Sequence, residues 1–183
     1  MAEILCPEDC EVALPIQEFD KCNPQINLSQ ITDILIAKGD AAPFEDVADP
    51  VEWAARLSQT DVTAGSDKIR RLTGIGSKAK PGAVTRALSK GRNVVINRNH
   101  SLNFKLDETN QANYDAMREH QCGGIYTIWY ITAGNNLFGG NNGIKVGLEA
   151  GPVLAESEDE IEILDYIFDW KNKFSEERVV SPI

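Results

Sequence analysis

The run from Ile125 to Thr132 constrains the fold more than any other part of the chain. It reads Ile-Tyr-Thr-Ile-Trp-Tyr-Ile-Thr, and its β-branched and aromatic residues favour a β-strand. Apolar side chains fall on both faces of this strand, so both faces have to be covered by other parts of the protein. A Gly- and Asn-rich segment follows, and its Asn142-Gly143 pair predicts a tight turn into a returning strand over 144–148.

Other short apolar runs, bounded by glycine, proline or asparagine, predict further strands. Ile31 to Ala37 is expected to be the first strand of the core. The remaining runs lie around 69–73, 84–88, 94–97, 102–106 and 160–170. In the last run Ile161 and Ile163 share one face, and the next apolar residues, from Leu164 on, share the other. That switch predicts a bulge, or a strand whose two faces have different partners.

Two segments have the signals of helices. Asp49 can cap a helix that has Pro50 at its first position, and Glu52 is placed to return a hydrogen bond to the cap, so a helix is predicted to about Leu57. Trp53 lies on its apolar side and is expected to be an anchor in the core or in an interface. The segment 108–121 predicts a second helix on the surface of the sheet.

The length of 183 residues and the 42% content of apolar residues are those of one domain with a sizeable core. We therefore predict an α+β fold, mainly an antiparallel β-sandwich or barrel with one or two flanking helices and extended terminal arms. Proline-rich residues 1–30 are expected to be an N-terminal arm, and 31–183 a single α+β assembly domain. With no signal peptide and no run near ~20 apolar residues, we expect a soluble chain with no membrane partner.

The charges of the chain are strongly segregated along the sequence. The net charge is −10, yet every charged residue from Lys68 to Lys105 is Lys or Arg, while both flanks are acidic. Three interpretations remain open: a nucleic-acid groove, charge pairing within the monomer, and pairing between copies of the chain. A single aromatic residue in the basic window, Phe104, disfavours the groove.

We prefer pairing between copies, in which the basic surface of one copy meets the acidic surface of the next. The residues expected at such an assembly interface are Lys78, Lys80, Arg86, Arg92, Trp53, Glu158, Asp159, Glu160 and Arg178.

No motif predicts catalysis or cofactor binding, so the chain is expected not to be an enzyme. The segment Gly74 to Lys78 lacks the spacing of a phosphate-binding loop. The two histidines, His100 and His120, neighbour no nucleophile motif and are expected to be polar surface or hydrogen-bonded residues.

The four cysteines allow one metal hypothesis. Cys6 and Cys10 are near ligand spacing, and Cys22 could add a third thiolate to a zinc site. Structural zinc sites usually show two tight ligand pairs and this chain shows one, so free thiols are preferred and no metal ligand is assigned.

The order of these features from Ile31 to Ile183 resembles virion structural proteins of tailed bacteriophages, particularly tail-tube-like proteins. The features are the early strand, the Asp49-Pro50-x-Glu52-Trp53 helix, the β-rich middle, the helix at Tyr114, the strand to Thr132 with its Gly/Asn hairpin, and the closing Phe168-x-Trp170 strand with the tail from Arg178.

The resemblance implies a non-enzymatic virion subunit, a β-sandwich with a flanking helix, that self-assembles in the host cytoplasm into rings stacked as a tube. DNA passes through such a tube, often along an acidic lumen. The implied partners are copies of the chain, other virion proteins and DNA in non-specific proximity. A head-decoration or connector protein is an alternative. Another is a monomeric glycan- or peptide-binding module with Trp129, Tyr130 and Phe138 lining an exposed pocket.

Overall fold

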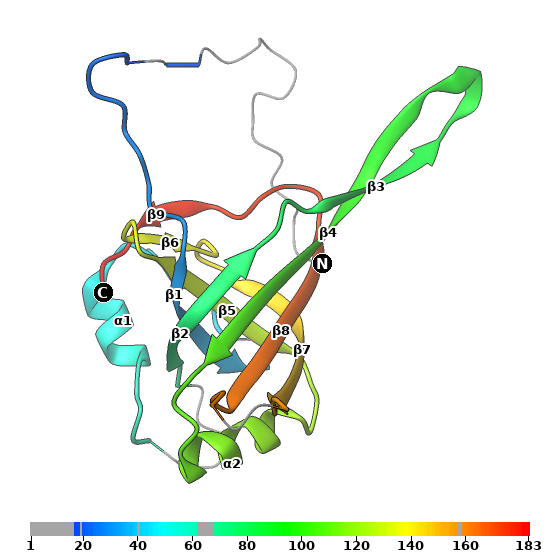
Figure 1. Cartoon of the computed structure of the whole chain (residues 1–183). Helices are drawn as coiled ribbons and strands as arrows, with labels where there is room; N and C mark the ends of the chain where they lie inside the picture. The colour runs from blue at the N-terminus through cyan, green and yellow to red at the C-terminus, as the bar shows by residue number, and fades with distance from the viewer. Residues whose placement is uncertain (1–16, 19, 40, 62–67, 157–158) are drawn as a thin grey trace.

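The structure is a computed structural model that describes residues 17–18, 20–39, 41–61, 68–156 and 159–183. The described residues form one sheet of nine strands, two α-helices and a short 3₁₀ turn (Figure 1). The strands are β1 Ile31–Lys38, β2 Arg70–Lys78, β3 Gly82–Ala87, β4 Asn93–Leu106, β5 Tyr126–Thr132, β6 Asn136–Phe138, β7 Ile144–Val153, β8 Ile163–Asn172 and β9 Arg178–Val180; the helices are α1 Pro50–Arg56 and α2 Gln111–His120, and the 3₁₀ turn is η1 Ser89–Gly91.

Six of the strands close into a barrel. Neighbouring strands pair in the order β1-β2-β4-β8-β7-β5, and β5 pairs back onto β1. All of these pairings are antiparallel. The fold is therefore mostly antiparallel β as predicted, and of the two predicted architectures it has the closed barrel. β6 and β9 extend the sheet beside β5, and β3 pairs with β4 alone among the described strands.

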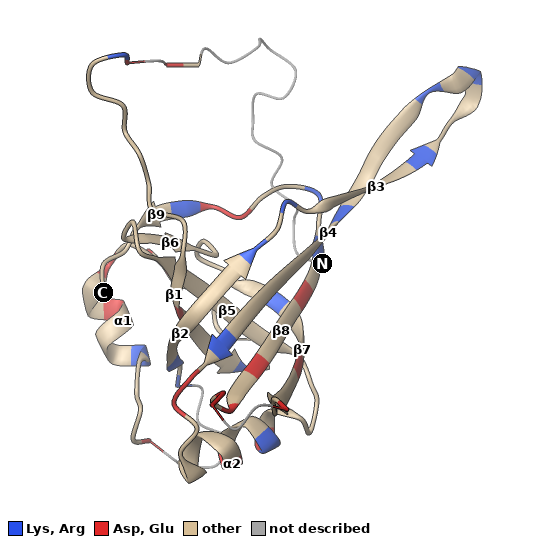
Figure 2. Ribbon diagram, viewed as in Figure 1, with Lys and Arg blue, Asp and Glu red and all other residues tan. Residues whose placement is uncertain are grey.

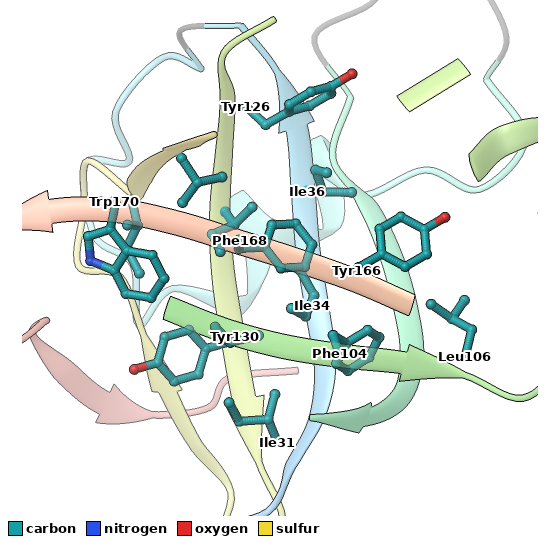
Figure 3. Packing of buried hydrophobic residues seen from close by; sticks show 14 of the residues in the cluster. Ile31, Ile34, Ile36, Phe104, Leu106, Tyr126, Tyr130, Tyr166, Phe168 and Trp170 are labelled. Carbon is teal, nitrogen blue, oxygen red and sulfur yellow. The ribbon is translucent and has the colours of Figure 1, made fainter. Parts of the chain in front are cut away.

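The barrel interior holds the larger of two apolar clusters (Figure 3). β8 supplies alternate residues to it, of which Tyr166 and Phe168 lie at 1% and 0% exposure. The alternation is regular along the whole of β8, and its pairing with β4 and β7 has no register shift. The predicted bulge is therefore wrong, because the strand begins only at Ile163, and Ile161 is an exposed residue of the preceding connection.

The second apolar cluster lies outside the barrel, against the other face of β5. All seven residues of β5 are buried, which confirms the prediction that both faces of this strand are covered. Trp129 packs edge-on against Phe44 and Trp53, with ring centroids 5.3 and 5.5 Å away. Trp53 is fully buried at 0% exposure, so of its two predicted roles it has the one in the core.

The strands of the middle region are longer than predicted. β2 continues through Gly74 and Gly76, and β4 runs without a break through Asn99. A Cβ atom on Gly76 would lie 2.8 Å from the Phe104 ring and 2.9 Å from Ile31. These two glycines therefore allow close packing inside a strand and do not mark a turn.

Both helices confirm the predicted segments, with differences in detail. The Asp49 side chain accepts from the Val51 amide at 2.8 Å, as expected for the cap. Glu52 does not close the predicted capping box; its carboxylate accepts from the amides of Glu45 and Asp46. α2 lies across one end of the barrel and buries Met117 in the interior, rather than lying flat on the sheet (Figure 1).

Of the predicted N-terminal arm, the structure describes residues 17–18 and 20–30. Residues 20–30 lack regular secondary structure and are all exposed. They leave the barrel at the start of β1, where Ile31 pairs with Gly76 near the end of β2. In the described ranges, no helix has the length and apolar content that crossing a membrane requires.

Candidate assembly interface

A long β-hairpin projects from one end of the barrel. β3 pairs with the first half of β4, from Gly82 opposite Asn99 to Ala87 opposite Asn93. The second half of β4 lies in the barrel wall between β2 and β8. The same strand therefore forms both the barrel and the projection, and Figure 1 shows the hairpin extending well clear of the remaining strands.

Local turn chemistry defines the tip of the hairpin. The amide of Leu88 donates to the carbonyl of Arg92 at 2.7 Å. Between them, Lys90 and Gly91 both have left-handed backbone angles, with φ of 61° and 71°. Glycine adopts this conformation without strain, whereas a residue with a side chain costs about 1–2 kcal/mol. The tip is thus a defined turn, held by the hydrogen bond and by Gly91.

The surface of the hairpin is both basic and apolar. Leu88, Val94 and Ile96 are 44%, 43% and 52% exposed. From Lys78 to Asn99 the chain has no acidic residue, and Figure 2 shows only basic charge along the hairpin; the exposed cations are Lys80, Arg86, Lys90 and Arg92. An isolated two-stranded ribbon is only marginally stable in water, so covering these exposed apolar side chains with a partner surface would stabilise the hairpin.

A buried carboxylate anchors the root of the hairpin. The side chain of Glu176 is 4% exposed, and Lys78, the last residue of β2, donates to its Oε2 at 2.7 Å. The Tyr130 hydroxyl donates to Oε2 at 3.2 Å, and Trp170 Nε1 donates to Oε1 at 3.0 Å. Nδ1 of His100 lies 3.0 Å from Oε1 but lacks hydrogen-bond geometry. One side chain from the C-terminal segment thus joins β2, β5 and β8 at the point where the hairpin leaves the barrel.

The electrostatics of this root favour a charged Glu176 and a neutral His100. Burial acts to raise the pKa of Glu176, but the hydrogen bond from Lys78, a backbone hydrogen bond and the charge of Lys78 together hold the pKa below its ordinary value. Burial lowers the pKa of His100, and the nearby Glu176 offsets this only in part. Burial and the adjacent carboxylate both raise the pKa of the Tyr130 hydroxyl, so it stays a donor. The root is therefore a buried Lys–Glu pair with two neutral donors.

The opposite end of the barrel carries several acidic side chains, together with the exposed cations Lys105 and Arg118, and also exposed apolar residues. There the end of β4 meets the start of β8, with Leu106 opposite Leu164, whereas Arg98 and Asn172 are opposite each other at the hairpin end. We define this acidic pole as the exposed charges and apolar side chains just beyond those strand ends. It comprises Asp107, Glu108, Glu156, Asp159 and Glu160 with Val153, Leu154 and Ile161.

The two poles are too far apart to neutralise each other within one chain. β4 joins them with 14 residues, which span about 46 Å at ~3.3 Å per residue. Charge interactions in solution are largely screened beyond about 8–10 Å at physiological salt. Ion pairs within the monomer, such as Arg71 with Asp33 at 2.8 Å, are local. The hairpin and the acidic pole of one chain therefore do not pair with each other, and any internal partner of either lies close to it.

The predicted interface residues lie in different parts of the structure. Arg86 and Arg92 lie on the hairpin and Lys80 in the connection that leads to it, whereas Asp159 and Glu160 lie at the acidic pole. Lys78 is held by Glu176, and Trp53 is fully buried, so neither is a free surface group of the monomer. Arg178 is exposed at the start of β9, and Glu158 lies outside the described residues.

The structure also corrects several predictions about single side chains. His100 is 1% exposed and stacks on Trp170 at 5.2 Å, so it is not a surface residue. His120 is partly buried against Tyr126 and Tyr166, and burial lowers its pKa. Trp129 and Tyr130 point into different clusters and cannot line one pocket.

Tyr130 and Phe138 do border a surface recess of about 540 Å³ beside the base of the arm.

The zinc hypothesis stays a prediction, because Cys6 and Cys10 lie outside the described residues. Cys22 is exposed and unbridged. Within the described part of the chain, no group of three or more His, Cys, Asp or Glu side chains is placed to hold a metal ion.

Sequence reasoning missed the residues that make the hairpin a site. Glu176 has no motif around it, and its role depends on strands far away in the sequence. The exposed Leu88, Val94 and Ile96 looked like ordinary strand residues, and only an unbroken basic run hinted that this region is a surface. Comparison with known proteins adds nothing further. No protein-family model matches this chain, and no curated protein is detectably similar to it.

Proposed function

We propose that this chain is a non-enzymatic virion structural subunit of the tail-tube type that assembles head to tail with copies of itself. The hairpin of one copy docks on the acidic pole of the next. The single observation that carries the proposal is the hairpin: a projecting ribbon with exposed apolar residues and only basic charge, at the opposite end of the barrel from an acidic surface.

The two poles complement each other in two respects. Lys90 and Arg92 at the tip are opposite in sign to Glu156 and Glu160 at the acidic pole. Both surfaces also present aliphatic side chains, which include Ile96 at 52% and Leu154 at 73% exposure. Covering a half-exposed aliphatic side chain stabilises a complex by roughly 1 kcal/mol, so the apolar contacts supply affinity while the charges set orientation.

A contact between unlike surfaces propagates. Each copy would use its hairpin once and its acidic pole once, which is a heterologous interface. Such interfaces close into rings or continue as stacks, depending on the rotation between copies. The net charge of −10 also suits a tube through which DNA passes, because a negatively charged wall repels phosphate groups. A head-decoration or connector subunit would use the same surfaces.

The test combines light scattering with negative-stain electron microscopy of the purified full chain. We expect rings or tubes at low salt that weaken as the salt concentration rises, because exposed charges are screened. The double variant Lys90→Glu, Arg92→Glu should assemble much less. Its matched control, Arg118→Glu with Lys171→Glu, makes the same change of net charge at exposed positions on α2 and β8, away from the hairpin tip, and should assemble like the wild type.

A wild-type chain that stays monomeric at high concentration, whatever the salt, would contradict the proposal. If the tip variant assembles as well as the wild type, the hairpin is not the element that docks on the next copy.

A further inference from the structure

Two described parts of the chain leave the barrel at the same end: the hairpin and residues 20–30 of the N-terminal arm. We propose that the arm of one copy, residues 1–30, adds as a strand to the open edge of β3 in the hairpin of a neighbouring copy. The proposal rests on the proposed function, since it requires an assembled neighbour, but the surface that it concerns is the open edge of β3 and not the acidic pole.

The described part of the arm is extended and unburied. Residues 20–30 are all exposed, including Ile26 at 81% and Leu28 at 64%. Only its base is attached: the backbone carbonyls of Leu28 and Gln30 accept from the amides of Gly134 and Ala133 at 3.1 and 2.8 Å. Beyond that point Figure 1 shows the arm leaving the barrel at the end from which the hairpin projects.

The hairpin offers an edge for such a strand. Among the described strands β3 pairs only with β4, so its outer edge presents free backbone donors and acceptors over Gly82–Ala87. An extended peptide that adds to an open edge gains main-chain hydrogen bonds, and side-chain complementarity then selects the peptide.

Charge and apolar content match the arm to the hairpin. In residues 1–30 the only cation is Lys21, among six acidic residues, and apolar residues lie between them; the acidic residues are Glu3, Glu8, Asp9, Glu11, Glu18 and Asp20. The hairpin has the opposite composition, with Lys80 and Arg86 beside exposed apolar residues such as Ile96.

The described arm is attached away from the hairpin of its own chain, and the rest of the arm is long enough to reach the hairpin of a neighbouring copy. Residues 1–20 can span up to about 66 Å when extended, far more than the roughly 20 Å of a six-residue strand. The side-chain and backbone hydrogen bonds of the described arm go to a turn at Asp20 and to the segment 133–136, and none goes to the hairpin of the same chain.

A charge-swap experiment on the full-length chain tests the proposal. One variant reverses two arm charges, Asp9→Lys with Glu11→Lys; the other reverses two hairpin charges, Lys80→Glu with Arg86→Glu. Each variant alone then sets its two reversed charges against unreversed residues of the same sign on the neighbouring copy, and its assembled fraction at low salt should fall at least about fivefold in sedimentation velocity. In a 1:1 mixture the two reversed arm charges can meet the two reversed hairpin charges, and assembly should return to the wild-type level.

Each outcome decides the proposal. If the arm variant assembles like the wild type, the arm proposal is overturned and the proposed function stands. If both variants fail alone and the mixture is not restored, the arm does not pair with a neighbour's hairpin, and the proposal is again overturned. A wild-type chain that never assembles overturns both. The control Arg118→Glu with Lys171→Glu and unchanged melting temperatures exclude general effects of charge or unfolding.

Discussion

Glu176 should be among the most sensitive positions for stability, although no motif marks it. Changing Glu176 to Ala removes the acceptor of three hydrogen bonds, from Lys78, Tyr130 and Trp170. It also leaves the Lys78 ammonium group, whose side chain is only 16% exposed, without its counter-charge.

The expected cost follows from the burial of the pair. Removing one partner of a buried ion pair typically costs 3–5 kcal/mol, because the remaining charge stays desolvated. We expect about 3–5 kcal/mol for Glu176→Ala and less for Glu176→Gln, which keeps an acceptor oxygen. Replacing both partners, as in Lys78→Met with Glu176→Leu, should cost less than Glu176→Ala, because no buried charge remains.

The assay is urea unfolding at pH 7, followed by tryptophan fluorescence, with the midpoint and slope fitted together. Glu177→Ala is the matched control, since Glu177 is the exposed neighbour in the sequence and should change the free energy of unfolding by no more than about 0.5 kcal/mol. A cost below about 1 kcal/mol for Glu176→Ala would refute the reasoning, because it would place the pair among screened surface salt bridges.

Two further predictions concern the barrel. Burial lowers the pKa of His100 below 6.5 in the folded chain, so the unfolded state binds a proton first, and the free energy of unfolding should fall as pH drops below about 6.5. In urea titrations from pH 7.5 to 5, His100→Gln should flatten this dependence of the free energy of unfolding on pH. An unchanged slope in that variant would contradict the prediction. Gly76→Ala, whose Cβ would meet Phe104 and Ile31 at 2.8 and 2.9 Å, should cost about 1–3 kcal/mol in thermal unfolding. Gly82→Ala is the control, because a Cβ atom there has nothing within 4 Å, and it should leave the stability nearly unchanged. Equal losses of stability in the two variants would show that the packing around Gly76 relaxes.

Much of the local structure could be predicted from short patterns. The core strand β1, the doubly buried β5 and the Asp49 cap of α1 all follow from residues that lie next to each other in the chain. Predictions failed where distant residues decide the outcome. Gly74 and Gly76 look like turn residues, but β2 continues through them because Phe104 packs against them from β4.

The candidate site could be predicted only in part. The basic run was evident in the sequence, and its members Lys80, Arg86 and Arg92 lie on the hairpin or at its base, whereas Arg70 and Lys105 lie toward the other end of the barrel. Its location outside the barrel was not evident, because strand runs around 84–88 and 94–97 suit a core hairpin as well as a projecting one. Nor does any local pattern place Glu176 beside Lys78, which is 98 residues away.

The sequence by itself determined which segments become strands and helices and where positive and negative charge gather, since these depend on side chains a few residues apart. Only the tertiary structure decided that the sheet closes as a barrel through the β1–β5 pairing, that β4 carries the basic hairpin and the acidic pole at its two ends, and that Glu176 is buried at the root. The physical reason is that strand pairing and burial join residues far apart in the chain, where the local pattern carries no information about the partner.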